Sequence, residues 1–455
     1  MFLSIQMGNL PSESTALKRQ SVASRPEIPP DPSAPLDQPL RVGEAMPQAD
    51  ELLVAGDVVR ALDVYEQLAA NSQGQLGEML EYRLAVCAEL LGRRDRALAA
   101  YTALAIQSTD DRLIVAARLG AARVWFALDN LEAANTLLCN VLLESTLHKD
   151  AMRQFGDDVA NLLAHIRARQ VDPEATDSLI DDLGIARPRL SWSPLASLIM
   201  NRDSAAPAAA DLKAAAPGIA ILQKYGDEPA DIQVTAHLER MAFGQIYQRL
   251  SNATGRRIIV SRQAEQAGVG KAVQLAVHNV SLDELLDNLV GPLGLTWHDD
   301  AAAIHIRSFD ELSDEQAAQR RGQLASRSLH RAVTLYPDHP LCASSYLALG
   351  NQAFRQRKYK NAIAHYRHLK REYPRSNADR EASFNEAKAH LLLGDLNGSR
   401  IAFLEVVDAL QGHPLEPAAY LYIGRLDLDS GKPRVASTAL KRALSLSTQK
   451  EIRQV

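Results

Sequence analysis

Small and large side chains recur along the last third of the chain at a constant step of 37 residues. The small residues at this step are Ala325, Ala362, Ser399 and Ala436. Four positions after each of them stands a large residue: Leu329, Tyr366, Phe403 and Leu440. Another small residue precedes the last three by twelve positions, at Gly350, Ala387 and Gly424. A fixed period in this range predicts a solenoid, in which each unit buries its apolar face on its neighbours.

Each unit has the pattern of two helices. Tyr346, Leu349 and Gly350 lie at i, i+3 and i+4, on one face of a first helix. Ala362 and Tyr366 share a face of a second helix in the same way. The small residues allow the two helices to approach closely, and the large residue one turn later fills the space beside them. We therefore expect one helical hairpin per unit.

The same spacing returns near the N-terminus. Small residues at Ala61, Ala97 and Ala134 are each followed four positions later by Tyr65, Tyr101 and Leu138. Their small partners twelve positions earlier are Ala49, Ala85 and Ala122. The sequence therefore predicts two helical arrays, over residues 45–170 and 309–455, on either side of a different middle.

The middle of the chain, residues 231–308, has the pattern of a small mixed domain with the element order βαββαββ. Ser281 with Glu284 three positions later forms a capping-box pattern before an apolar helix. The predicted strands and first helix are, in order, Ile232–Leu238, helix Ala242–Ala253, Ile258–Val260, Val273–Val277, Leu295–Trp297 and Ala303–Ile306.

The repeat resembles the tetratricopeptide repeat family. The matching segments are Tyr346–Gly350, Tyr359–Tyr366 and Tyr373-Pro374, and the last is similar to bacterial envelope members. The resemblance implies a mainly α fold with two tetratricopeptide solenoid arrays. It also implies a non-enzymatic scaffold that binds protein or peptide partners, with a role in envelope assembly or secretion.

The middle domain resembles the short N-terminal domain of secretins and TonB-dependent receptors. The matching segments are Leu250–Gly255, Val277–Leu286 and Gly294–Trp297. Family members place this domain ahead of a pore or a barrel, and no amphipathic β-region follows it here, which leaves docking as its expected role. Both resemblances imply the periplasm or cell envelope. Met1–Leu10 does not have the pattern of a signal peptide, so a cytoplasmic location stays an alternative.

Two segments outside the arrays and the middle domain are characterised by their composition alone. Residues 1–44 are rich in proline and serine and are predicted to be disordered. Residues 171–230 contain an alanine-rich tract and several prolines and are predicted to be a linker. The first repeat of the second array is predicted to be incomplete, with a single helix from about Ser313 to Leu335. We expect it to follow the middle domain directly and to cap the second array.

The sequence contains no motif that indicates a catalysed reaction. There is no zinc-protease or nucleophile-elbow motif. His365 and His368 lie three positions apart on a helix without a third ligand, so we expect a solvated face and no metal or cofactor. The cysteines make no metal spacing, and no stretch is long enough to span a bilayer. The chain is therefore predicted not to be an enzyme, although it could regulate or carry a partner enzyme.

Charge is uneven along a chain of net charge −5. Residues 311–455 hold 22 Lys and Arg against 15 Asp and Glu. Part of this excess is a basic patch opposed in sequence only by Glu372, which could attract acidic peptides, anionic lipids or, as the basis of a cytoplasmic adaptor, nucleic acid. The alternative is a solvated helix face. The basic patch consists of Arg355, Arg357, Lys358, Lys360, Arg367, Lys370, Arg371 and Arg375.

Repeat geometry places three positions of each first helix on the concave wall of the second array. The pattern is an apolar groove with one amide and two cations, which would take an acidic extended segment or a terminal carboxylate. The alternative is packing against a neighbouring helix or the linker. The groove residues are Leu347, Asn351, Phe354, Phe384, Lys388, Leu391, Leu421, Arg425 and Leu428.

Overall fold

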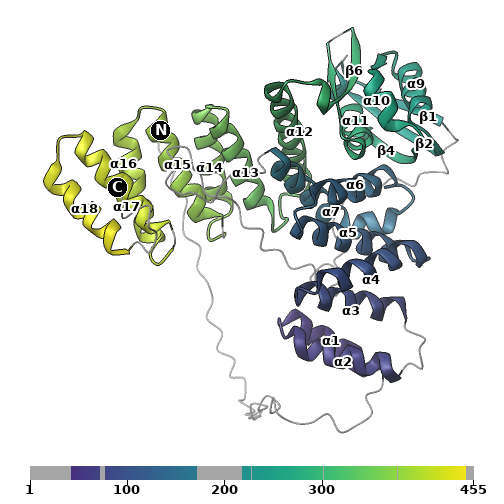
Figure 1. Ribbon diagram of the computed structural model, residues 1–455, viewed down its shortest axis with the longest axis horizontal. Helices are drawn as coiled ribbons and strands as arrows, with labels where there is room; N and C mark the ends of the chain where they lie inside the picture. The colour runs from purple at the N-terminus through teal and green to yellow at the C-terminus, as the bar shows by residue number, and fades with distance from the viewer. Residues whose placement is uncertain are drawn as a thin grey trace, which may run out of the picture.

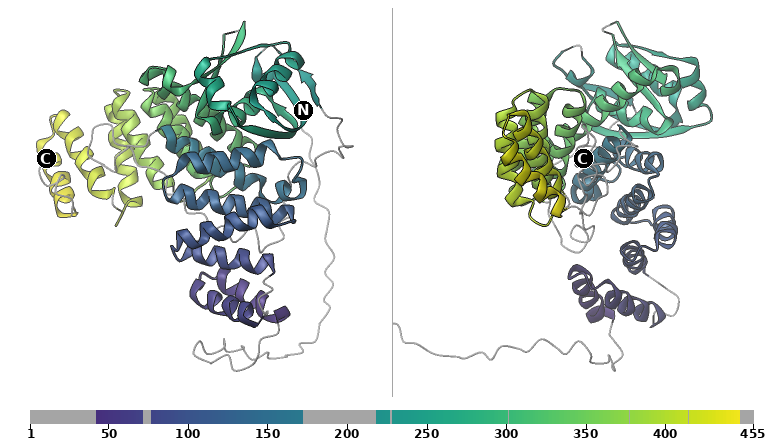
Figure 2. Two further views of the ribbon diagram at one scale, coloured as in Figure 1. Left: turned by 45° about the vertical axis from the view of Figure 1, so that its right-hand side comes forward. Right: turned by 60° about the vertical axis from the view of Figure 1, so that its left-hand side comes forward.

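The computed structural model describes residues 42–71, 77–171, 218–226, 228–300, 302–376, 378–413 and 415–446. Two arms of antiparallel helices meet beside a small α+β domain (Figure 1). The arms run in different directions from this meeting point, as a second view also shows (Figure 2). The first arm and the helix that ends it comprise α1 (Val42–Val54), α2 (Val58–Asn71), α3 (Glu78–Leu90), α4 (Arg94–Gln107), α5 (Asp111–Ala127), α6 (Leu131–Leu143) and α7 (Lys149–Val171).

The hairpin that begins with α7 is completed by a helix far along the chain. Helix α12 (Asp314–Leu335) packs along α7 as α6 packs along α5. Ala164 of α7 shares a buried cluster with Leu329 and Ala332 of α12. Helix α13 (Cys342–Arg355) then packs on both members of this pair. The prediction of two separate arrays is therefore wrong, because the helices form one continuous stack with the middle domain inserted between the two helices of one hairpin.

Helix α12 begins where the sequence predicted it. Ser313 is its N-cap, and its hydroxyl accepts a hydrogen bond from the Gln316 N–H at 3.3 Å. The Gln316 side chain in turn accepts from the Ser313 N–H at 3.2 Å, which completes a capping box. The helix does not cap the second arm, however. It fills the second position of the interrupted hairpin.

The small and large residues of the repeat meet inside the hairpins as predicted. Ala362, Ser399 and Ala436 are fully buried. A Cβ atom added to Gly424 would lie 2.6 Å from the Leu440 side chain, so only glycine allows this approach. The second arm continues with α14 (Tyr359–Glu372), α15 (Asp379–Leu392), α16 (Leu396–Ala409), α17 (Glu416–Asp429) and α18 (Pro433–Leu446).

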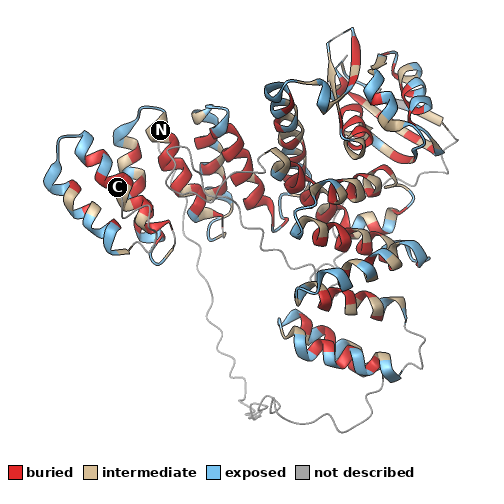
Figure 3. Ribbon diagram, viewed as in Figure 1, coloured by how far each residue is buried: buried red, intermediate tan, exposed pale blue. Residues whose placement is uncertain are grey.

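The inserted domain packs two three-stranded sheets around one core. Strands β1, β2 and β4 form an antiparallel sheet, and β3, β6 and β5 form a second sheet in which β3 and β6 are parallel. Buried residues of its helices and strands form a single cluster (Figure 3). Its elements are β1 (Gly218–Lys224), β2 (Ile232–Ala242), α9 (Phe243–Thr254), β3 (Arg257–Val260), α10 (Arg262–Gly268), β4 (Ala272–Ser281), α11 (Leu282–Val290), β5 (Leu295–Asp299) and β6 (Ala303–Ser308).

Every strand and helix predicted in the middle is present, together with β1 and α10, which the sequence pattern did not predict. Strand β1 lies inside the range predicted as a linker and pairs with β2 from Gly218–His237 to Lys224–Ile232. We therefore place the start of the inserted domain at β1. The predicted disordered segment 1–44 lies almost entirely outside the described residues, as do residues 172–217 of the predicted linker.

Candidate partner-binding surfaces

The predicted concave groove is largely closed. Five of its nine residues are buried, including the amide Asn351 and the cation Lys388, which is only 1% exposed. The prediction that the Lys388 head is solvated in an open groove is therefore wrong. The other buried groove residues are Leu347, Phe354 and Phe384.

The groove is closed because successive first helices pack against one another, as α13 does on α15. The Asn351 side-chain oxygen accepts hydrogen bonds from the Tyr366 hydroxyl at 2.8 Å and from the Asn385 amide of α15 at 2.9 Å. The Lys388 ammonium lies 5.2 Å from the ring centre of Tyr422 on α17, within cation–π range. These side chains therefore connect one unit to the next and are already engaged by contacts within the stack.

In the first arm, ion pairs join the first helices of successive units. Asp50 of α1 accepts from the Arg83 guanidinium of α3 at 2.6 and 2.7 Å. Glu89 of α3 accepts from Arg123 of α5, with both distances 2.9 Å. Sequence reasoning missed this ladder, although a carboxylate on one first helix and an arginine on the next were visible in the sequence.

Four groove residues stay accessible and form what we call the C-terminal strip: Leu391, Leu421, Arg425 and Leu428. Leu391 of α15 and Leu421 of α17 are partly exposed. Arg425 and Leu428 on α17 are exposed. The strip therefore combines apolar surface with one cation.

The basic patch lies on the turn between α13 and α14 and along α14. Seven of its eight residues are exposed, and Lys370 is partly buried. It is less positive than the sequence suggested, because Glu386 of α15 accepts from Arg367 at 2.7 Å and from Lys370 at 3.1 Å. The prediction that only Glu372 opposes the patch is therefore wrong. The exposed charge is concentrated at the turn.

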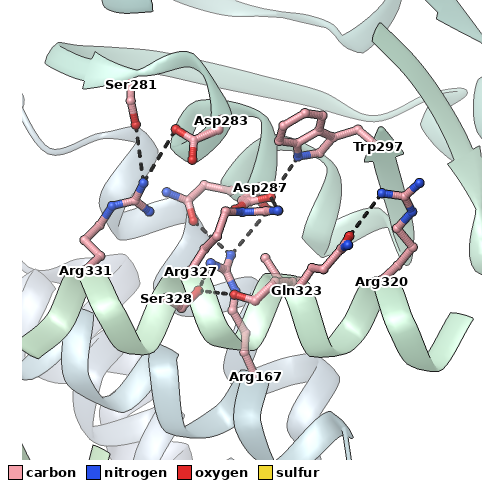
Figure 4. Close-up of polar contacts among 12 residues, drawn as sticks. Arg167, Ser281, Asp283, Asp287, Trp297, Arg320, Gln323, Arg327, Ser328 and Arg331 are labelled. Carbon is pink, nitrogen blue, oxygen red and sulfur yellow. Dashed lines mark hydrogen bonds and ion pairs between the residues drawn. The ribbon is translucent and has the colours of Figure 1, made fainter. Parts of the chain in front are cut away.

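A buried arginine joins the inserted domain to the solenoid (Figure 4). Arg167 of α7 is 2% exposed. Its guanidinium donates to the Asn288 side chain of α11 and to the Ser328 hydroxyl of α12, both at 2.9 Å. It also lies 3.4 Å from the Asn135 oxygen and the Cys139 sulfur of α6. One side chain thus binds three solenoid helices and the inserted domain together.

Two further arginines of α12 extend this junction. Arg327 binds both oxygens of buried Asp287 at 3.0 and 2.6 Å, and the Trp297 indole N–H donates to the same carboxylate at 2.7 Å. Arg331 lies 3.1 Å from the Glu284 carboxylate and 3.3 Å from the Ser281 hydroxyl. The predicted capping box at Ser281 is therefore wrong: Ser281 makes no side-chain cap bond, and both side chains face α12 instead.

The tetratricopeptide repeat family matches residues 311–377, the part of the stack formed by α12, α13 and α14. The fold of this family generally mediates protein–protein interaction, and it is typically not catalytic. The matched residues begin immediately after the inserted domain, at the second helix of the interrupted hairpin.

Solved structures similar to this chain include three of low identity. The apo form of RapI is 6% identical, with a TM-score of 0.46, over 90% of this chain and 78% of that one. A tetratricopeptide repeat protein from Parabacteroides merdae is 10% identical, with a TM-score of 0.38, over 90% and 96%. A signal-transduction ATPase with a tetratricopeptide repeat sensor from Pyrococcus horikoshii is 11% identical, with a TM-score of 0.35, over 88% and 45%. No curated protein matches the sequence.

A cavity of about 480 Å³ on the inserted domain is lined mostly by apolar side chains such as Phe243 and Ile258, with Glu265 as its carboxylate. His365 is partly buried beside His330 and Tyr346, and burial lowers its pKa. Among the described residues, no group of His, Cys, Asp or Glu is arranged to hold a metal ion.

The three cysteines, Cys87, Cys139 and Cys342, are free and buried. Burial raises the pKa of the Cys87 thiol to about 12 and raises that of Cys139, so both are protonated at neutral pH. In the described part of the chain, no helix combines the length and the apolarity that crossing a membrane requires.

Proposed function

We propose that this protein is a non-enzymatic docking scaffold of the tetratricopeptide type in the bacterial cell envelope, which presents a secretin-type domain at a fixed position on its solenoid. The observation that carries the proposal is the Arg167 junction. A domain joined by flexible linkers needs no buried cation, whereas Arg167 binds α6, α7, α11 and α12 together. A fixed position is useful when two surfaces must engage one assembly at the same time.

The inserted domain supports the secretin-type assignment through its element order. The βαββαββ succession is present, with β1 added before it and α10 within it. Docking is the function that we assign to this domain, because buried contacts hold it against the solenoid helices α6, α7 and α12.

The partner of the second arm would be an acidic extended segment. The C-terminal strip offers Leu421 and Leu428 for apolar side chains and Arg425 for a carboxylate. The basic patch at Arg357 and Lys358 would attract such a segment at longer range, since both residues are exposed.

Site-specific photo-cross-linking in intact cells tests this proposal. A photoreactive residue at Leu428 should cross-link to one partner, and Arg425→Glu in the same chain should abolish that product. The matched control is a photoreactive residue at Ile401, which is 56% exposed on α16, outside the strip. Identical products from both positions, or none from Leu428, would contradict the proposal. A nucleic-acid product would favour the adaptor instead.

A further inference from the structure

A second contact between the inserted domain and the solenoid borders a cavity of about 330 Å³. Helix α6 forms one side, and β2, β4, α9 and α11 contribute to the other. Leu143 of α6 is 1% exposed and belongs to the same buried cluster as Leu289 of α11. Beyond α6, the Thr146 N–H donates to the Ala276 carbonyl of β4 at 2.8 Å. The two sides of the cavity are therefore held in place, and domain interfaces of this kind often hold ligand sites.

Four polar side chains line this junction cavity, two from each side. Arg240 of β2 and Lys271, which precedes β4, are exposed cations of the inserted domain. Thr136 and Asn140 of α6 are partly exposed. Within the described part of the chain, no hydrogen bond or ion pair occupies any of these four side chains. All four are therefore available to a ligand.

The lining of the junction cavity carries two positive charges and no negative one, because it includes no Asp or Glu. The other large side chains of the lining are apolar. The cavity therefore complements a ligand that has one anionic group and a short apolar body. Its volume is at the lower end of the range for ligand sites, about 300–1,000 Å³, which indicates a small ligand. The apolar lining consists mainly of Leu143, Phe243, Val273, Leu289, Pro292 and Leu293.

The turn before β4 does not form a backbone cradle for phosphate, although Gly268 and Gly270 precede Lys271 there, as glycines do in phosphate-binding loops. The Val269 N–H donates to the Gln266 carbonyl at 3.1 Å, and the Lys271 N–H donates to the Gly268 carbonyl at 3.2 Å. Both N–H groups are therefore already engaged. Side chains must hold the anionic group, which suits the two oxygens of a carboxylate better than the larger set of a phosphate.

We propose that the junction cavity binds a small carboxylate with a short apolar body. Arg240 and Lys271 hold the carboxylate, Asn140 donates to it from α6, and the apolar lining takes the body of the ligand. Such a ligand contacts both sides of the junction, so it binds the docked arrangement of the inserted domain and stabilises it by mass action. This inference rests on the cavity and is independent of the proposed envelope function.

Isothermal titration calorimetry on the full chain tests the site, with hexanoate as the probe. Hexanoate should bind at one site per chain, and hexanamide, which has a similar shape without the charge, should bind at least about tenfold more weakly. Arg240→Gln and Lys271→Gln should each raise the dissociation constant of hexanoate at least about tenfold. Asn140→Asp should raise it at least as much, because the new carboxylate repels the ligand from the α6 side.

Matched controls are Arg249→Gln on α9 and Arg262→Gln on α10, which remove exposed cations of the inserted domain outside the cavity. These variants should bind hexanoate as the wild type does. Inorganic phosphate should bind more weakly than hexanoate, because it makes no apolar contact. Tighter binding of N-acetyl-dileucine than of hexanoate would identify the ligand as the terminal carboxylate of a protein, and the reverse order would identify it as a free fatty acid.

Hydrogen exchange measured by mass spectrometry tests the effect on the junction. Saturating hexanoate should slow the exchange of α6 and α11 amides in the wild type and not in Lys271→Gln. The proposal is overturned if hexanoate does not bind, if hexanamide or inorganic phosphate binds as tightly, or if the controls weaken binding as much as Arg240→Gln does. It is also overturned if bound hexanoate leaves the exchange of α6 and α11 unchanged.

Discussion

Replacing Arg167 with methionine should loosen the inserted domain from the solenoid. Methionine keeps much of the buried volume but removes the donors that reach Asn288 and Ser328, both at 2.9 Å. Hydrogen bonds to a charged group contribute about 1.5–3 kcal/mol each. These two short bonds are lost together with longer ones to Asn135, Cys139 and the Asp287 carbonyl at 3.3–3.4 Å. The cost of burying the arginine charge is relieved at the same time and offsets part of the loss. We expect a net destabilisation of about 3 kcal/mol at this junction.

Hydrogen exchange measured by mass spectrometry localises this effect. Amides of α11 and α12 should exchange more than about a hundredfold faster in Arg167→Met, since 1.4 kcal/mol corresponds to a factor of ten. Amides of α18, far along the stack, should be unchanged. Arg169→Met is the matched control, because Arg169 lies on the same helix with its side chain 41% exposed and 3.6 Å from Asp129. If both variants exchange alike, Arg167 does not hold the junction.

Three further predictions concern the repeat core, the groove and acid stability. Gly350→Ala should lower the free energy of unfolding by about 1–3 kcal/mol in denaturant titrations, because its Cβ would clash with a buried tyrosine ring; Gly244→Ala, which has nothing within 4 Å, should not. Lys388→Ala should lower the free energy of unfolding by about 2 kcal/mol or more, whereas Arg425→Ala should change it by no more than about 0.5 kcal/mol. Equal effects of the two substitutions would show that the groove is open in solution. Burial lowers the pKa of His165 to about 4, so the unfolded chain binds the extra proton between about pH 6.5 and 4 and stability falls as pH drops. His165 should account for a loss of about 2 kcal/mol in the free energy of unfolding between pH 7 and pH 5. If the urea midpoint of His165→Asn depends on pH as strongly as that of the wild type, this prediction is contradicted.

The repeat itself could be predicted because its packing is local. Ala362 and Tyr366 lie in one helix, and their partner Gly350 is twelve positions away, so the pattern survives in a short window of sequence. The structure confirms the pattern, with Tyr366 fully buried against the helix that carries Gly350.

The interrupted hairpin could not be predicted from that pattern. Its two helices are α7 and α12, whose facing residues Arg167 and Ser328 are separated by the whole inserted domain. The repeat pattern alone indicates one array that ends and another that begins, because no local sequence feature indicates that α7 and α12 pair.

The accessibility of the predicted groove residues could be predicted only in part. The C-terminal strip is accessible at Arg425 and Leu428, but Asn351 and Lys388 are buried. The prediction placed these residues on the concave wall from an average repeat geometry. In this protein, successive first helices contact each other and bury Asn351 and Lys388. How closely neighbouring units pack depends on all their side chains together, which single positions do not reveal. Ser281 shows the same limit, since its local capping pattern is overridden by contact with α12.

Whether the inserted domain and the second arm form one rigid body can be measured directly by the distance between spin labels. Labels would replace two exposed residues, Gln245 on α9 and Gln411 beyond α16, while the three native cysteines are buried. A continuous stack with a fixed insertion predicts one narrow distance distribution in the wild type, which broadens in Arg167→Met. A broad distribution already present in the wild type would contradict the account, because the inserted domain would then move freely on the solenoid.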